Sequence, residues 1–447
     1  MDTTEAFYTL DRFRRTVYDW VLGHRKDTMF ELMEAVLVAQ GPTTTVRLSL
    51  EAVFRRRWPS APDALAEGSL DVAELRELIH RRLAAEPTLA RPVWALDGTV
   101  WPRPAAETSP ERTWVHRAAP GRPQDGVVPG WEYQWLVDVV AEHGSWVRPL
   151  DVARRSPTSG SPTTLALGQL RTALGCRPRG AARPVVTMDS SYDVLELARA
   201  VHDPRQPLGA DLLVRLPLRR RFFRKPPPYS GIGGPRKHGD VFNLKKPESW
   251  STPDHTARMD DVRHGTIQVD VWDEMHDQHG ARVSFPVVRV QAERLPKSTR
   301  RPKPLWLAWL GKEPLADILD YWRIYSLRFT VEHALRFLKG DLGWTTVRPR
   351  DPAAADRWSW LLVLVMWQLY LARSLVADAR LPWERPRAVA GLSPGRVRRA
   401  MPAILARLGT PARGVRPRGK SPGRRLGERP GPQARCPTHY RREKRAA

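Results

Sequence analysis

The sequence predicts a mixed α/β protein that begins with a helical domain, and three observations lead to this prediction. Residues 1 to about 90 carry apolar residues at helical spacing, as at Phe13, Val17 and Val21. From Pro92 onward, short apolar runs separated by turn residues replace that spacing. These runs then alternate with helical stretches. A run of strands followed by strand–helix alternation is typical of a sheet flanked by helices.

The composition indicates a cytoplasmic protein with a sizeable core. The chain has 447 residues, 41% of them hydrophobic, so two or three structural units are expected. Its two cysteines, Cys176 and Cys436, are far apart, which argues against a disulfide framework or a zinc site. The most apolar run, Trp358 to Leu371, is interrupted by Gln368 and is too short to span a membrane. No N-terminal pattern of a signal peptide is present.

The charge is strongly basic and points to a polyanion. The formal net charge is +25, and clustered Lys and Arg gain affinity for nucleic acid by displacing counterions from phosphates. From Pro411 onward, twelve Lys and Arg residues stand against two Glu, with Pro and Gly throughout. Such a segment is expected to be disordered. A genome that favours Arg, or the tail alone, remains an alternative explanation of the charge.

Changes in residue composition and in the spacing of apolar residues divide the chain into five expected segments. The stretch from Arg219 to Pro247 is rich in Arg, Lys, Pro and Gly, and hairpin-like pieces follow it, so it reads as an insertion. The expected segments are an N-terminal helical domain (1–90), the first part of the α/β domain (91–220), a β-rich basic insertion (221–300), the second part of the α/β domain (301–380) and a basic, largely disordered tail (381–447).

Two aspartates are candidates for chemistry because of where they stand. Asp97 and Asp189 each end a short apolar run. A carboxylate at the carboxyl end of a buried strand points into the crevice where open α/β sheets bind their ligands. Aspartates at strand ends also serve as plain turn formers and helix caps. Asp138 and Asp151, on neighbouring candidate strands, are the alternatives to Asp97.

A third acid lies on a helical segment with cationic neighbours. At about 100° per residue, five side chains fall on one polar stripe and apolar residues occupy the opposite side. A single carboxylate among an aromatic and three cationic side chains suits a surface that holds a metal ion beside a phosphodiester. An ordinary amphipathic helix with a solvated face is the alternative. The stripe consists of Tyr325, Arg328, Glu332, Arg336 and Lys339.

Four members of this stripe carry a family resemblance. Tyr325, Arg328, Glu332 and Lys339 follow one another at intervals of two, three and six intervening residues. This spacing resembles the Tyr-Arg-Glu-Lys signature of bacterial insertion-sequence transposases, which belong to the DDE superfamily and have an RNase H-like catalytic core. The likeness covers residues from about 90 to 375. It implies an RNase H-like mixed sheet with flanking helices and a β-rich insertion.

The resemblance also implies a catalytic centre. Asp97, Asp189 and Glu332 would be the catalytic and metal-binding residues, and Mg²⁺ or Mn²⁺ would be the ions, since hard oxygen ligands suit them. These ions would support DNA cleavage at the element ends and strand transfer.

For the other members of the stripe, the resemblance implies contact with DNA. Tyr325, Arg328 and Lys339 would be DNA-binding residues. Arg336 is added only because it shares the stripe. The partners would be double-stranded DNA, both transposon ends and target, and a second copy of the chain in a synaptic homodimer. The N-terminal helical domain would bind DNA, and the protein would lie with the nucleoid. A catalytically silent, transposase-derived DNA-binding protein or repressor is the alternative, and a nuclease without strand transfer is a third possibility.

Overall fold

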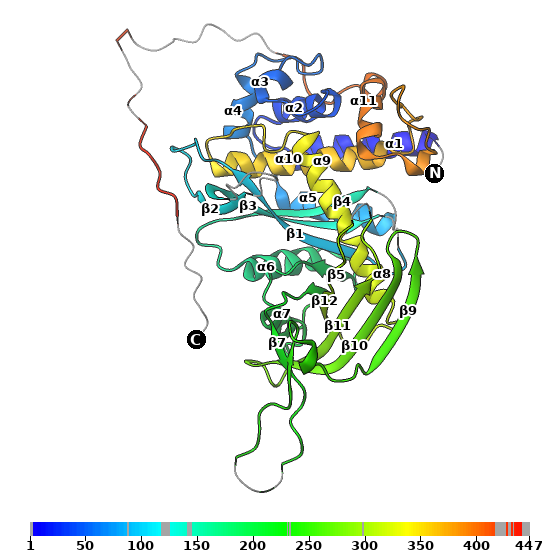
Figure 1. The fold of residues 1–447 in the computed structure, drawn as a ribbon. Helices are drawn as coiled ribbons and strands as arrows, with labels where there is room; N and C mark the ends of the chain where they lie inside the picture. The colour runs from blue at the N-terminus through cyan, green and yellow to red at the C-terminus, as the bar shows by residue number, and fades with distance from the viewer. Residues whose placement is uncertain are drawn as a thin grey trace.

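One large mixed sheet lies between two groups of helices, as Figure 1 shows. The computed structural model describes residues 3–86, 89–117, 126–140, 145–229, 231, 234–296, 299–415, 426–427, 431 and 433–439. No helix in these described ranges has the length and apolar character needed to cross a membrane.

The centre of the sheet has the strand order of an RNase H-like fold. Five strands lie side by side in the order β4-β3-β1-β5-β6. Strand β3 is antiparallel to both of its neighbours, β4 and β1, whereas β5 and β6 run parallel to β1. The predicted fold class is therefore confirmed. The bounds are β1 (Val93–Pro102), β3 (Gly126–Val139), β4 (Val147–Arg155), β5 (Val185–Met188) and β6 (Asp211–Arg215).

The strands from the expected insertion continue this same sheet. Strand β12 pairs antiparallel with β6, β11 with β12, and β10 with β11. The long hairpin β10–β11 and its neighbour β9 form the β-rich lobe at the lower right of Figure 1. The bounds are β2 (Thr113–Arg117), β7 (Arg221–Phe223), β8 (Val241–Asn243), β9 (His255–Asp261), β10 (Gly265–Asp277), β11 (Ser284–Ala292) and β12 (Leu305–Leu310).

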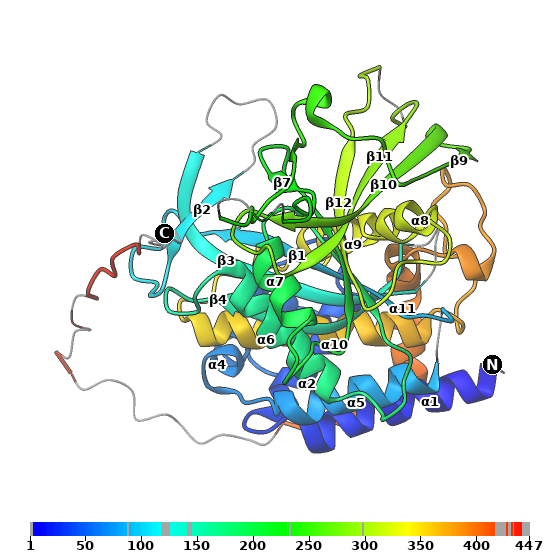
Figure 2. The ribbon, with the colours of Figure 1, turned by 90° about the horizontal axis from the view of Figure 1, so that it is seen from below.

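Helices cover both faces of the sheet, as Figures 1 and 2 show from two directions. On one side lie α6 and α7. On the other, the long apolar α10 packs against β4 and is covered by α1, α2, α4 and α11. The bounds are α1 (Thr3–Thr16), a π-helical turn (Val17–Val21), α2 (Lys26–Val38), α3 (Thr45–Leu48), α4 (Ser60–Glu67), α5 (Val72–Ala85), α6 (Pro162–Gly175), α7 (Val194–Val201), α8 (Asp320–Leu327), α9 (Phe329–Gly340), α10 (Pro352–Ala372) and α11 (Pro394–Leu408), with short 3₁₀ turns at Pro247–Ser249 and Val389–Gly391.

A buried polar network joins the N-terminal helices to α10. Arg14 of α1 is 1% exposed and forms an ion pair with Glu34 of α2 at 2.5 Å. The same guanidinium donates to the Oε1 of Gln368 at 2.9 Å and to the carbonyl of Gly409 at 2.8 Å. Apolar residues of α1, α2 and α10 belong to one continuous core cluster. The helical region therefore packs as part of the same core as the sheet.

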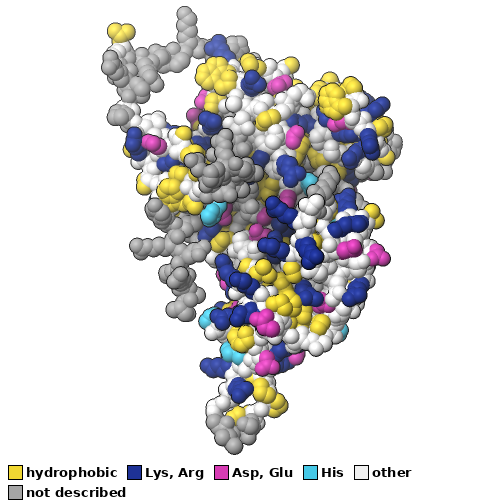
Figure 3. Space-filling model, viewed as in Figure 1, with side chains coloured by type: hydrophobic (Ala, Val, Ile, Leu, Met, Phe, Trp, Pro, Cys, Tyr) yellow, Lys and Arg dark blue, Asp and Glu magenta, His cyan; other side chains and the backbone are white. Residues whose placement is uncertain are grey.

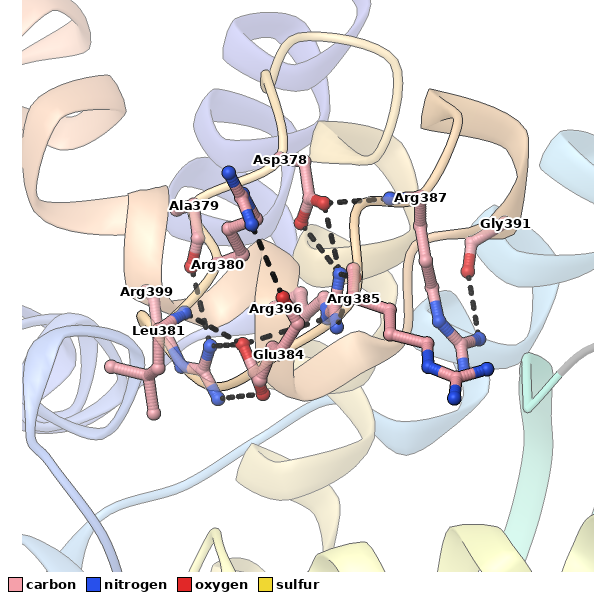
Figure 4. A network of polar contacts seen from close by, with 10 residues as sticks. All are labelled: Asp378, Ala379, Arg380, Leu381, Glu384, Arg385, Arg387, Gly391, Arg396 and Arg399. Carbon is pink, nitrogen blue, oxygen red and sulfur yellow. Dashed lines mark hydrogen bonds and ion pairs between the residues drawn. The ribbon is translucent and has the colours of Figure 1, made fainter.

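Part of the expected tail is folded. Residues 394–408 form α11, which contacts α2 and α10. Figure 4 shows how the preceding loop is held to it: Arg396 pairs with Asp378 at 2.9 Å, and Arg399 pairs with Glu384 at 2.5 Å. Sequence composition missed this helix because its basic residues have partners within the fold: Arg396 and Arg399 pair with acids of a loop, and Arg398 donates to the carbonyls of Val36 and Asp341.

Farther along the tail, a short piece lies against the loop between β1 and β2. The amide of Cys436 donates to the carbonyl of Glu107, and that of His439 to the carbonyl of Arg112, both at 2.8 Å. The other tail residues for which disorder was expected, 416–425, 428–430, 432 and 440–447, lie outside the described residues.

Candidate active site

Two neighbouring parallel strands place Asp97 beside Asp189. The register pairs Leu96 of β1 with Met188 of β5, and each aspartate directly follows its member of that pair. Asp97 is 9% exposed and Asp189 is half-buried. The two aspartates therefore lie next to each other where β5 ends. Strand β1 continues to Pro102, however, so the expectation that Asp97 stands at the end of its strand is wrong.

Asp189 is also oriented by its own loop. The backbone amide of Ser191 donates to Asp189 Oδ1 at 2.9 Å, and the Ser191 hydroxyl donates to the same oxygen at 2.5 Å. These bonds hold one carboxylate oxygen, whereas no bond is recorded for Oδ2 among the described residues. Asp189 is therefore held in place with one oxygen free for another partner.

The third acid comes from a helix that crosses this edge. Glu332 lies in the first turn of α9, and its side chain is 45% exposed. The expected continuous helix is in fact two, α8 and α9, which meet at Arg328. The amide of Arg328 bonds to the carbonyl of Tyr325, and the amide of Val331 to that of Arg328, so the chain tightens by one residue at this joint.

Arg328 links the first and third acids. Its Nη1 donates to Asp97 Oδ2 at 3.1 Å and its Nη2 donates to Glu332 Oε1 at 3.0 Å. The side chain of Arg328 is only 6% exposed, so both contacts are shielded from solvent on the arginine side. One guanidinium thus holds together two carboxylates that lie 235 positions apart in the sequence.

The pKa of Asp97 shows that all three acids act on one another. Burial is the largest cause that raises the pKa of Asp97, to about 6. The negative charges of Asp189 and Glu332 raise it further, and Arg328 opposes the shift. A carboxyl that is buried beside two other carboxylates favours a proton or a cation. This electrostatic setting is typical of a site that concentrates positive charge.

The stripe of five side chains is only partly a surface. The apolar side of the helical segment is buried as expected, at Val331 and Leu335 for example. However, Tyr325 and Arg328 are only 1% and 5% exposed, so these two members of the stripe are not on the surface that the helical wheel indicated. The joint between α8 and α9 turns both side chains toward the sheet. A helical wheel assumes one unbroken helix on an isolated surface, so it does not reveal such burial.

The two remaining cations of the stripe differ in position. Lys339 is half-buried over the ring of Trp344, with 5.9 Å from its Nζ to the ring centroid. Burial lowers the pKa of Lys339, and the charge of Asp97 opposes this shift. Arg336 is exposed, and its recorded contact is to His333 at 3.5 Å. Lys339 is thus a half-buried cation over an aromatic ring, whereas Arg336 is exposed to solvent.

The alternatives to Asp97 have structural partners. Asp138 is 3% exposed and accepts two bonds from Arg148, at 2.9 and 2.7 Å. Asp151 is 1% exposed and pairs with Arg76 at 3.0 Å. Both are buried ion pairs on the sheet and neither is grouped with Asp189 or Glu332. This geometry favours Asp97 over its rivals.

The residues at this edge have the chemistry that a divalent cation requires. The three carboxylates of Asp97, Asp189 and Glu332 supply hard oxygen ligands. Within the same residues, no three His, Cys, Asp or Glu side chains are already grouped as metal ligands. The Arg328 guanidinium accounts for this at Asp97 and Glu332, because it occupies the space between them. The oxygen donors are therefore of the kind that such an ion prefers, but in this structure Arg328 engages two of the three carboxylates.

Sequence reasoning missed two features of the site. The contact of Arg328 with Asp97 joins distant segments, and no local pattern signals it. Tyr192, three residues after Asp189, is buried with its hydroxyl unpartnered among the described residues. An aromatic residue next to a helix N-cap ordinarily reads as core packing, so its sequence position carried no signal.

Comparison with known proteins gives a family for this chain. The family described as DDE superfamily endonuclease matches residues 20–273, a range that contains Asp97 and Asp189 and ends before α9. No curated protein matches the sequence. Among solved structures, the chain is similar to a piggyBac transposase in a synaptic complex with hairpin DNA, seen by cryo-EM, with a TM-score of 0.40, 10% identity, and coverage of 92% of this chain and 82% of that chain. Since the family match spans more than half of the sequence, the chain belongs to the DDE superfamily endonucleases.

Proposed function

We propose that this protein is a DNA transposase of the bacterial insertion-sequence type with the Tyr-Arg-Glu-Lys signature. It would bind the terminal inverted repeats of its element, cut at the ends and join them to target DNA. The observation that carries this proposal is the meeting of Asp97, Asp189 and Glu332 at one edge of the sheet, in a chain of the DDE superfamily. A second copy of the chain would complete the synaptic complex at the nucleoid.

The proposed chemistry is phosphoryl transfer supported by two Mg²⁺ or Mn²⁺ ions. When bound, such ions activate water or a 3′-hydroxyl and stabilise the leaving oxygen. Asp97, Asp189 and Glu332 would hold them. The raised pKa of Asp97 means that its carboxylate gains more from a cation than an exposed carboxylate does. Cation binding would also release Arg328, whose guanidinium would then be free to bind a DNA phosphate.

Basic residues around this edge support a DNA partner. Lys339 lies beside the acids and Arg336 is exposed one turn after Glu332. Figure 3 shows Lys and Arg side chains spread across the face that carries α8 and α9 and down onto the β-rich lobe. Cations on either side of an acidic centre would position the phosphodiester backbone over the ions. Tyr325, buried next to Arg328, would contact DNA only after local movement.

The proposal is tested with purified full-length protein, Mg²⁺ and DNA that carries the element ends. Asp97→Asn, Asp189→Asn and Glu332→Gln should each abolish cleavage and leave DNA binding in place. Glu77→Gln, an exposed acid on α5, is the matched control and should cleave normally. Cleavage by Glu332→Gln at the wild-type rate would falsify the assignment. Wild-type protein that binds the ends without cutting them would support the silent DNA-binding alternative.

A further inference from the structure

A cavity lies between the C-terminal half of α5, the sheet and the loop that follows α6. Its volume is about 370 Å³, which falls within the roughly 300–1,000 Å³ of pockets that bind small molecules. Residues 177–182 of the loop form one wall, and Trp94 of β1 belongs to another. Trp94 stands three positions before Asp97, and successive side chains of a strand point to opposite faces. The cavity and the candidate active site therefore lie on opposite faces of the sheet.

A buried imidazole with an unpartnered nitrogen lines this cavity. His80 of α5 is 2% exposed, and its Nε2 has no hydrogen-bond partner among the described residues. Burial lowers the pKa of His80 to about 4, and the charge of Arg177 adds to this shift, so the ring is neutral near pH 7. A buried polar atom without a partner costs stability, and so does a cavity. A molecule in the cavity that bonds to Nε2 would relieve both costs.

Aromatic and apolar side chains form much of the remaining lining. The rings of His80 and Trp94 lie 6.1 Å apart, with 62° between their planes. The guanidinium of Arg177 lies over the Trp94 ring, with 5.5 Å from its Cζ to the ring centroid. Leu83 and Leu89 add apolar surface. Planar aromatic groups pack favourably against rings and guanidinium groups of this kind.

The charged side chains that line the cavity leave an excess of positive charge. Asp138 accepts two hydrogen bonds from Arg148, at 2.9 and 2.7 Å, so these two charges offset each other. Arg177 is half-buried and Arg179 is exposed on the loop. Arg177 also donates to the carbonyl of Ala182 at 2.8 Å, which ties the two ends of the loop together. The loop side of the cavity therefore favours an anionic group.

We propose that this cavity binds a nucleoside monophosphate. The base lies against Trp94 and bonds to His80 Nε2, and the phosphate lies toward Arg177 and Arg179. A neutral imidazole has one donor and one acceptor nitrogen, and the edge of a nucleobase offers partners for either. Guanidinium groups form strong, charge-assisted hydrogen bonds with phosphate oxygens. The site does not depend on the proposed function, because none of the three candidate catalytic acids lines it.

The test is binding of adenosine 5′-monophosphate to the full-length protein, measured by isothermal titration calorimetry without divalent ions. Adenosine and inorganic phosphate are titrated separately, because each carries one half of the ligand. The wild type should bind the monophosphate more tightly than either. Arg177→Met should weaken this binding about 10-fold, as expected for the loss of one hydrogen bond to a charged group, and should change adenosine binding less. His80→Phe should weaken binding of the monophosphate and of adenosine alike.

A matched control separates the cavity from the basic surface of the protein. Arg171 is an exposed arginine of α6 that is not among the described residues lining the cavity, so Arg171→Met should bind the monophosphate as the wild type does. An equal loss in Arg171→Met and Arg177→Met would mean that the anion binds the general surface, and the proposal would fail.

Two further outcomes would overturn the proposal. The first is a wild type that does not bind the monophosphate, and the second is an unchanged affinity in both Arg177→Met and His80→Phe. In either case the cavity holds only water. Thermal melting reports the fold of each variant. If His80→Phe does not melt cooperatively, Arg177→Met, which changes a half-buried loop residue, decides the question.

Discussion

Replacing Arg14 by methionine tests whether the N-terminal helices and α10 share one core. Arg14 and its partner Glu34 have side chains that are only 1% and 3% exposed. Arg14→Met keeps the apolar stem and removes the charge, so Glu34 is left buried without its partner. Breaking a buried pair in this way typically costs about 3–5 kcal/mol. The bonds to Gln368 and Gly409 are lost with it.

The neighbouring residue provides a matched control. Arg15 lies on the same helix and pairs with Asp11 at 2.8 Å, but its side chain is 60% exposed. A solvated pair of this kind contributes at most about 1 kcal/mol. Urea unfolding of Arg14→Met and Arg15→Met is monitored by far-ultraviolet circular dichroism. Because both variants remove the same side chain from an ion pair on the same helix, the difference in their loss of unfolding free energy measures the effect of burial. Equal losses of unfolding free energy in the two variants would refute the reasoning.

The loss in Arg14→Met should also depend on pH. Burial raises the pKa of Glu34 above its usual value, and Arg14 opposes this shift. Without Arg14 the folded-state pKa rises further above that of the unfolded chain. A carboxyl of this kind is favoured in the fold when protonated, so the penalty grows as pH rises above the unfolded pKa. The destabilisation should be smaller at pH 5 than at pH 8, and Glu34→Gln in the same chain should recover part of it.

Three further measurements follow from the structure. Burial, and after it the charge of Arg177, lowers the pKa of His80 to about 4 from 6.5, so the fold holds a neutral imidazole that the unfolded chain protonates. The free energy of unfolding should therefore fall by up to about 3 kcal/mol as pH drops from 6.5 toward 4. In urea unfolding, His80→Phe should remove this dependence on pH. The same dependence on pH in the wild type and in His80→Phe would contradict the role of His80. The carboxylate of Asp378 accepts hydrogen bonds from the Arg396 side chain and from the backbone amide of Arg387. Asp378→Asn should therefore speed proteolysis of the loop in Figure 4. An unchanged rate of cleavage in this loop would show that the loop does not depend on these bonds. Deleting residues 416–447 should flatten the dependence of log DNA affinity on log salt, and an unchanged slope would mean that the tail does not touch DNA.

Local patterns in the sequence were enough to predict the fold class. The run before Asp189 is strand β5, and the run before Asp97 is the first half of strand β1, which continues to Pro102. Helical periodicity predicted buried faces at residues such as Val331. These properties depend on residues a few positions apart, and such spacing is visible in one sequence. Composition was less reliable: the basic stretch that includes α11 was expected to be part of a tail.

The candidate site is a different matter, because it joins distant segments. The sequence by itself determined that Asp97 and Asp189 follow apolar strand segments and that Glu332 lies on a helix. Only the tertiary structure decided that Arg328 reaches Asp97 and that Tyr325 is buried. The physical reason is that burial and charge–charge contact arise from packing between elements. A helical wheel or a motif spacing describes one helix or strand alone. Neither shows which other element packs against that helix or strand.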